Sequence, residues 1–102
     1  MSTWKECFPD YPAADMPPLP KCWVDVSWPN DSCPSFESES LHAVLYVDYV
    51  DTAKREFPEM PRFSVCALDD DGELIDQNPL AEGDDLGTVL TNLYIKTRRR
   101  KR

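Results

Sequence analysis

The sequence predicts an α+β domain, in which a small and mostly antiparallel sheet of three or four strands packs against one C-terminal helix. Three observations predict this fold class. Residues 41–50 alternate like a buried strand, residues 84–95 have the apolar spacing of a helix, and residues 1–20 are rich in proline. The chain has 102 residues, enough for one hydrophobic core. We therefore expect an extended proline-rich arm at 1–20, a single domain at 21–95 and a basic tail at 96–102.

The N-terminal segment contains five of the ten prolines of the chain. Proline fixes φ and pushes the preceding residue toward extended geometry. Residues 1–20 are therefore predicted to run extended over the surface rather than to form a long helix or a central strand. We expect this segment to dock on the domain, because disordered segments are usually poor in aromatic residues. The expected anchors are Trp4, Phe8, Tyr11 and Leu19.

Residues 21–28 alternate as the residues of a strand do. Trp23, Asp25 and Ser27 share one face of this predicted strand. The residues of the other face are Cys22, Val24, Val26 and Trp28. Residues 29–40 are rich in serine, proline and acidic residues, so we expect a loop there.

Residues 41–50 give the strongest strand pattern in the chain. β-Branched and aromatic residues occur on both of its faces, which predicts a central strand. In this pattern His42 is a half-buried sheet residue rather than a catalytic base, because a base needs a positioned partner. Residues 53–57 are expected to form one helical turn, which the prolines that follow bring to an end.

Residues 62–68 and 73–76 are predicted to form a hairpin, because an Asp-Gly pair lies between them. A two-residue turn would place two acidic residues opposite each other, which destabilises a sheet. A three-residue loop with Gly72 in the left-handed conformation places Leu68 opposite Leu74 instead. We therefore prefer the register with the three-residue loop.

After a predicted loop at residues 77–83, the apolar period changes to that of a helix. Asp84 is the predicted N-cap of this helix, and Asp85 suits the positive end of its dipole. The basic residues after Tyr94 suit the negative end. The residues of the apolar face are Leu86, Val89, Leu90 and Leu93.

Charge is distributed unevenly along the chain. Residues 1–95 contain all 19 acidic residues and only 5 basic ones, a net charge of −14, whereas the last seven residues have a charge of +6. A domain this acidic repels nucleic acid and attracts basic protein surfaces. Two other interpretations remain open: the acidic surface serves solubility alone, and the tail is a solvated end or folds back on the acidic body.

No catalytic or metal-binding pattern is present in the sequence. The four cysteines, at positions 7, 22, 33 and 66, lack the close pairs of a zinc site. The sequence from Asp69 to Gly72 does not fit the spacing of an EF-hand. No nucleophile and base occur in a recognisable arrangement, so we expect no cofactor, no metal and no enzymatic activity. Because no stretch of signal-peptide type is present, we expect reduced thiols and a cytoplasmic location. Cys66 lies in an apolar strand pattern, so we expect it to be buried in the core.

Two acidic clusters are the candidate contacts for a protein partner. One lies on the predicted hairpin and the other at the start of the predicted helix. If the helix packs on the hairpin, the two clusters form a single negative patch at one end of the domain. The candidate residues are Asp69, Asp70, Asp71, Glu73, Asp76, Glu82, Asp84 and Asp85.

Carboxylates on a rigid surface can replace the phosphates of a nucleic acid in a groove lined by lysine and arginine. We therefore expect a small intracellular protein that binds and inhibits a basic, nucleic-acid-handling protein complex, with no membrane and no small-molecule substrate involved. In size and charge, although not in sequence motifs, it is comparable to the acidic inhibitors of phages and mobile elements, anti-CRISPR proteins among them.

The alternative is an accessory protein that binds nucleic acid directly through its basic tail. The residues of this alternative site are Lys96, Arg98, Arg99, Arg100, Lys101 and Arg102.

Overall fold

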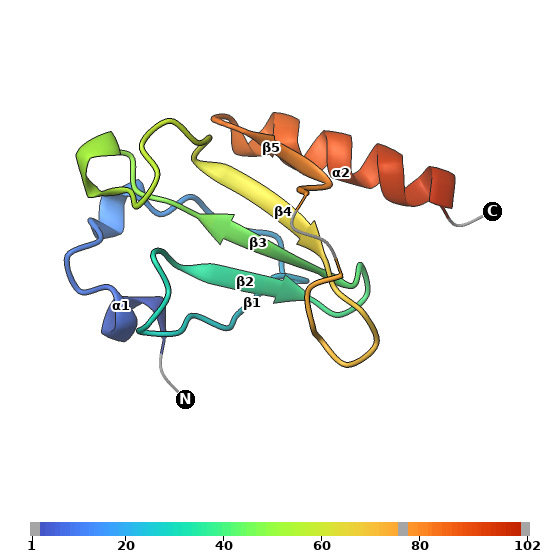
Figure 1. Ribbon diagram of the computed structural model, residues 1–102, viewed down its shortest axis with the longest axis horizontal. Coiled ribbons are helices and arrows are strands. Elements are labelled where there is room, and N and C mark those ends of the chain that lie inside the picture. The colour runs from blue at the N-terminus through green and yellow to red at the C-terminus, as the bar shows by residue number, and fades with distance from the viewer. Residues whose placement is uncertain (1–2, 76–77, 101–102) are drawn as a thin grey trace.

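A computed structural model describes residues 3–75 and 78–100, with side chains described as far as residue 97. It contains an antiparallel sheet of five strands in the order β1-β2-β3-β4-β5 (Figure 1). The strands are β1 (Val24–Asp25), β2 (Ser35–Ser38), β3 (Ala43–Val47), β4 (Phe63–Ala67) and β5 (Ala81–Gly83). The helical elements are α1 (Trp4–Cys7), η1 (Ala13–Asp15), η2 (Thr52–Lys54) and α2 (Leu86–Arg100). The α+β class and the C-terminal helix are confirmed, but the sheet has five strands rather than three or four.

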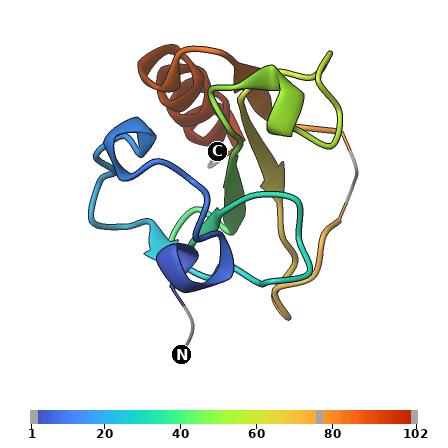
Figure 2. The same ribbon diagram turned by 90° about the vertical axis from the view of Figure 1, so that its left-hand side faces the viewer.

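One face of the sheet is covered by two segments from opposite ends of the chain (Figure 2). α2 packs on β4 and β5. The N-terminal segment lies on the same side, and its Phe8 and Tyr11 are buried in the same core as Val89 and Leu93 of α2. The apolar face predicted for the helix is thus the face that packs on the sheet.

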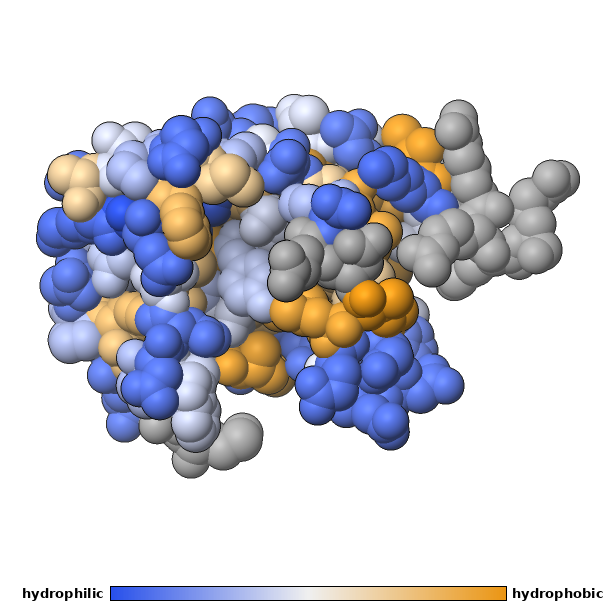
Figure 3. Space-filling view, viewed as in Figure 1, coloured by the Kyte–Doolittle hydropathy of each residue, from blue (hydrophilic) through white to orange (hydrophobic). Residues whose placement is uncertain are grey.

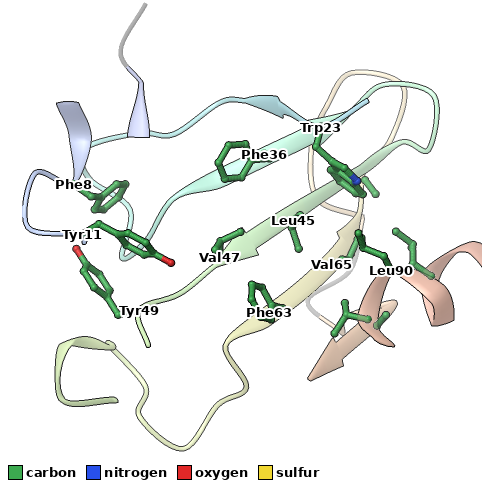
Figure 4. Close-up of a cluster of buried hydrophobic side chains, with 14 residues drawn as sticks. Phe8, Tyr11, Trp23, Phe36, Leu45, Val47, Tyr49, Phe63, Val65 and Leu90 are labelled. Carbon is green, nitrogen blue, oxygen red and sulfur yellow. The ribbon is translucent and has the colours of Figure 1, made fainter. Parts of the chain in front are cut away.

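β3 is the middle strand of the sheet, as its pattern predicts. Leu45 and Val47 are fully buried on the covered face, because alternate residues of a strand point to the same side. Figure 4 shows how the core extends from Tyr11 and Tyr49 at one end of the sheet to Trp23 at the other. The buried aromatic residues of this core are Phe8, Tyr11, Trp23, Phe36, Tyr49 and Phe63.

The N-terminal segment is not simply extended, because it contains α1 and η1. α1 is a single turn that ends before Pro9, and Thr3 and Glu6 form a capping box at its start. Phe8 and Tyr11 are buried. Trp4 and Leu19 are partly buried and pack against the same core. The prolines therefore limit the length of the helical turns in this segment without excluding them.

Two strands lie in segments that the sequence predicts to be loops. β2 lies within residues 29–40, and β5 lies within residues 77–83. β2 has only one large apolar side chain, Phe36, and its backbone pairs with β1 on one side and β3 on the other. Backbone pairing from two neighbours stabilises a strand whose own side chains have little β-propensity.

The predicted strand that precedes each of these two segments is shorter than expected. The strand predicted at 21–28 is reduced to β1, and the strand predicted at 73–76 is reduced to one bridge between Leu68 and Leu74. This bridge confirms the preferred hairpin register. Gly72 has φ +82°, so it adopts the expected left-handed conformation.

Two local predictions are wrong. The N-cap of α2 is Asp85 rather than Asp84, because the Asp85 carboxylate accepts hydrogen bonds from the backbone N–H and the hydroxyl of Thr88 (2.9 and 2.8 Å). His42 is exposed and lies in the β2–β3 turn with φ +49°, so it is not a sheet residue. Histidine is one of the residues that enter this left-handed region more often than most. The helical turn expected at 53–57 begins earlier, at Thr52 in η2.

Candidate functional site

The face of the sheet opposite α2 carries no α-helix among the described residues, and we name it the open face (Figures 1 and 2). Strand register places two rows of side chains across it. The first row consists of Val24, Glu37, Val44 and Cys66. The second row consists of Ser35, Tyr46, Ser64 and Glu82.

Several large apolar side chains remain exposed at the β1 edge of the open face. Val24 and Val26 are 58% and 42% exposed, because the alternation that buries Trp23 turns them outward. Trp28, a little further along the chain, is 59% exposed. Contiguous exposed apolar side chains with polar neighbours are typical of interaction surfaces.

A second apolar patch lies next to the β4–β5 hairpin loop. Leu74 and Ile75 are 50% and 60% exposed. Figure 3 shows an orange patch directly beside the blue, hydrophilic loop on this side of the molecule. The open face therefore combines apolar surface with acidic groups.

Three carboxylates belong to the open face. Glu37 lies between Val24 and Val44 in the first row, and Glu82 ends the second row. Asp48 follows β3 on the same side, and burial raises the pKa of its carboxyl group, which the neighbouring arginine charges oppose. Glu37 and Asp48 are not among the site residues predicted from the sequence. Alternation along 41–50 could have found Asp48, whereas Glu37 lies in the unpredicted strand.

The arginines near this face form hydrogen bonds inside the protein rather than with its carboxylates. Arg55 donates to the carbonyl oxygens of Tyr49 (2.7 Å) and Met60 (3.0 Å). Arg62 donates to the carbonyl oxygen of Asp48 (3.0 Å) and the hydroxyl of Tyr11 (2.8 Å). Their positive charge is therefore fixed by structural contacts with neutral oxygen atoms.

The two predicted acidic clusters do not form one patch, because they lie at opposite ends of β4. Asp69, Asp70, Asp71 and Glu73 follow the end of β4 in the hairpin loop. At the other end, Asp84 accepts a hydrogen bond from the backbone N–H of Arg62, which precedes β4 (3.0 Å). Asp76 lies outside the described residues.

Several members of these clusters have structural partners. The Asp69 carboxylate accepts hydrogen bonds from the backbone N–H groups of Asp71 (2.8 Å) and Glu73 (3.0 Å), which fixes the hairpin turn. The hydrogen bonds of Asp85 to Thr88 lower the pKa of the Asp85 carboxyl group. Asp70, Asp71, Glu73 and Glu82 are exposed, so they are the predicted residues best placed to contact a partner.

The basic tail continues α2 beyond its last fully buried residue, Leu93. The Lys96 ammonium group donates a hydrogen bond to the carbonyl oxygen of Leu80, which ties the helix to the segment before β5. The backbone of Arg98, Arg99 and Arg100 is helical, and Lys101 and Arg102 lie outside the described residues.

Comparison with known proteins provides no relative. No family model, no curated protein and no solved structure matches this chain. The function must therefore be inferred from the arrangement of the side chains alone.

The thiol of Cys33, which lies just before β2, is buried and poorly reactive. Cys33 is 4% exposed, and burial together with the charge of Asp48 raises the pKa of its thiol to about 12. A thiol with such a pKa is almost entirely protonated near neutral pH and is a poor nucleophile. Cys66 is buried, as predicted. Among the described residues, no group of three or more His, Cys, Asp or Glu side chains is arranged to hold a metal ion.

The helices of the described residues are short or polar. Within residues 3–75 and 78–100, none is both long enough and apolar enough to cross a bilayer.

Proposed function

We propose that this protein binds a basic surface of a nucleic-acid-handling protein and inhibits that protein by occupying its nucleic-acid-binding site. The observation that carries this proposal is the set of hydrogen bonds formed by the two arginines near the open face. Arg55 and Arg62 donate to carbonyl and hydroxyl oxygens inside the protein, so they do not neutralise the exposed carboxylates by direct contact. Carboxylates without a close counter-charge attract the lysine and arginine side chains of a partner.

The apolar part of the open face also supports partner binding. Protein interfaces combine a central apolar area with a polar rim. Val24, Val26 and Trp28 supply exposed apolar area, and Val24 lies next to Glu37 on the adjacent strand. The acidic hairpin loop lies at one end of the face, and Glu82 lies on its last strand. A nucleic-acid-binding groove offers basic side chains at its rim, which matches this distribution of charge.

The first test identifies the partner and then measures competition. The tagged protein is used to capture proteins from a nuclease-treated bacterial lysate at low and at high salt, with identification by mass spectrometry. The captured nucleic-acid-binding protein is then purified and mixed with labelled DNA or RNA. We expect this protein to displace the labelled nucleic acid in a fluorescence anisotropy assay, with weaker displacement at high salt. Simultaneous binding of both ligands would contradict the proposed mimicry.

Variants of the acidic loop test the contact itself. We expect Asp70→Asn combined with Asp71→Asn to weaken partner binding roughly five- to tenfold at low salt, because two rim charges are removed. Asp69 is left unchanged, since it fixes the turn. The control is Glu6→Gln combined with Asp15→Asn, which removes the same charge from the N-terminal segment. Equal weakening by both pairs would indicate an effect of net charge rather than contact at the loop.

Direct binding of nucleic acid through the tail is the second candidate function. α2 extends past Leu93, so the basic end of the helix is not required for the buried core. A variant that ends at Thr97 distinguishes the two candidates. Retained inhibition supports the acidic surface, whereas loss of binding to DNA or RNA supports the tail.

A further inference from the structure

A small cavity opens on the open face between two loops. It has a volume of about 160 Å³. Its floor is the second row of the open face, with Tyr46, Ser64 and Glu82 side by side on adjacent strands. Phe57 and Met60 line it from the loop that precedes β4. The remaining lining residues are Ser32, Cys33, Asp48, Pro61 and Arg62.

The cavity has an apolar part that the protein itself leaves exposed. Phe57 and Met60 are 55% and 45% exposed although both line the cavity. The ring of Tyr46 is partly buried beside them. Together these side chains offer an apolar wall and an aromatic surface to a group that enters from solvent.

The cavity also has a negative part. Glu82 and Asp48 both line it, and the Asp48 carboxylate accepts a hydrogen bond from the backbone N–H of Tyr49 (2.9 Å). The cation in the lining, Arg62, donates to the carbonyl oxygens of Asp15 and Asp48 and to the hydroxyl of Tyr11. These three contacts direct the guanidinium group toward the N-terminal segment and the end of β3. Glu82 is therefore available to a cation from outside, whereas the nearby charges of Arg55 and Arg62 already offset part of the charge of Asp48.

Resting on the proposed binding of a basic partner, we propose that this cavity receives the side chain of one arginine of the partner protein. The aliphatic part of an arginine packs on apolar surface while its charged head reaches polar groups. Phe57 and Met60 contact the aliphatic part, Tyr46 faces the guanidinium plane, and Glu82 with Asp48 accepts its hydrogen bonds. Arginine fits better than lysine, because a planar guanidinium both stacks on an aromatic ring and donates in several directions.

An apolar side chain from the partner would not fit this cavity as well. It would cover Glu82 and Asp48 without pairing them, and burial of a carboxylate that lacks a partner is strongly unfavourable. A cation with an apolar stem is thus the occupant that matches both parts of the lining.

The test is an NMR titration of the full chain with N-acetyl-L-arginine amide. The matched control is N-acetyl-L-citrulline amide, which has nearly the same shape but no charge. We expect the arginine compound to shift the backbone amide signals of Tyr46, Ser64 and Glu82. We expect the citrulline compound to bind at least about tenfold more weakly, because a charge-assisted hydrogen bond is lost.

Variants locate the binding. Glu82→Gln is expected to remove the response to the arginine compound, and Asp71→Asn, in the distant hairpin loop, is expected to leave it unchanged. Glu82 is exposed, and the unshifted remainder of the spectrum reports that the variant is folded. Equal responses to both compounds, or an unchanged response in Glu82→Gln, would overturn the proposal.

The titration also separates this inference from the proposed function. If the arginine compound does not bind and an identified partner binds Glu82→Gln with unchanged affinity, the cavity is not the anchor and the proposed function remains. If the arginine compound binds at the cavity but no captured protein competes with nucleic acid, the cavity is supported and the proposed function fails.

Discussion

Arg62 connects three parts of the chain through one side chain. Its guanidinium group donates to the hydroxyl of Tyr11 (2.8 Å), the carbonyl oxygen of Asp15 (2.6 Å) and the carbonyl oxygen of Asp48 (3.0 Å). It thereby holds the N-terminal segment against the end of β3. Hydrogen bonds to a charged donor contribute more than neutral ones, about 1.5–3 kcal/mol. The guanidinium group of Arg62 therefore stabilises the fold through neutral oxygen atoms rather than through a carboxylate of the acidic loop.

Trp23 is a buried residue with an unsatisfied polar group. It is 6% exposed, and its indole N–H is the one buried side-chain polar group found without a hydrogen-bond partner among the described residues. We expect Trp23→Ala to lower the free energy of unfolding by about 3–5 kcal/mol, because a large cavity forms. Trp23→Phe is expected to cost much less, because it removes the unsatisfied N–H along with part of the ring. Urea denaturation measures both values, and a loss for Trp23→Phe as large as the loss for Trp23→Ala would contradict this expectation.

At the scale of elements, the prediction succeeded where apolar periodicity lies within one segment. The alternation of 41–50 and the helical spacing of 84–95 identify β3 and α2, because each pattern is set by burial of one face. β2 and β5 were missed because their stability depends on pairing with neighbours rather than on their own side chains. The same error hid Glu37 as a site residue. The two acidic clusters are separate because the hairpin loop and the start of α2 lie at opposite ends of β4.

The hairpin loop and the start of α2 each contain a glycine, and the two glycines are expected to respond in opposite ways to substitution. Gly72 has φ +82° with open space around it, so Gly72→Ala is expected to destabilise the protein by about 1 kcal/mol through backbone strain alone. Gly87 lies in α2, where an added Cβ would meet only ordinary contact at 3.5 Å. Gly87→Ala is expected to stabilise by about 0.5–1 kcal/mol. Thermal unfolding of both variants checks the signs, and a loss of stability in both would contradict the assigned conformations.

At the scale of the whole molecule, charge opposes folding. The net charge is −8, and the six basic residues of the last seven positions offset part of a much larger negative charge. Like charges on a compact body repel each other, and salt screens this repulsion. The tail is therefore expected to stabilise the fold by long-range attraction, whatever partner it contacts.

A variant that ends at Thr97 tests this role of the tail. It lacks five basic residues, so its net charge changes from −8 to −13. We expect its unfolding temperature to lie below that of the full chain at about 0.01 M salt, and the difference to become small at about 1 M, where screening is strong. A difference that persists at high salt would show that residues 98–102 act through packing instead of charge.

The two segments that cover the sheet come from opposite ends of the chain, and this order matters during synthesis. On the ribosome, the N-terminal segment and β1 to β4 emerge first, and Phe63 and Val65 then lack the residues of α2 that bury them. A polypeptide interrupted before Val89 keeps an apolar sheet in contact with water, which favours aggregation and recognition by chaperones and proteases. The fold therefore distinguishes chains that include α2 from chains interrupted before it, since only the former can close this core.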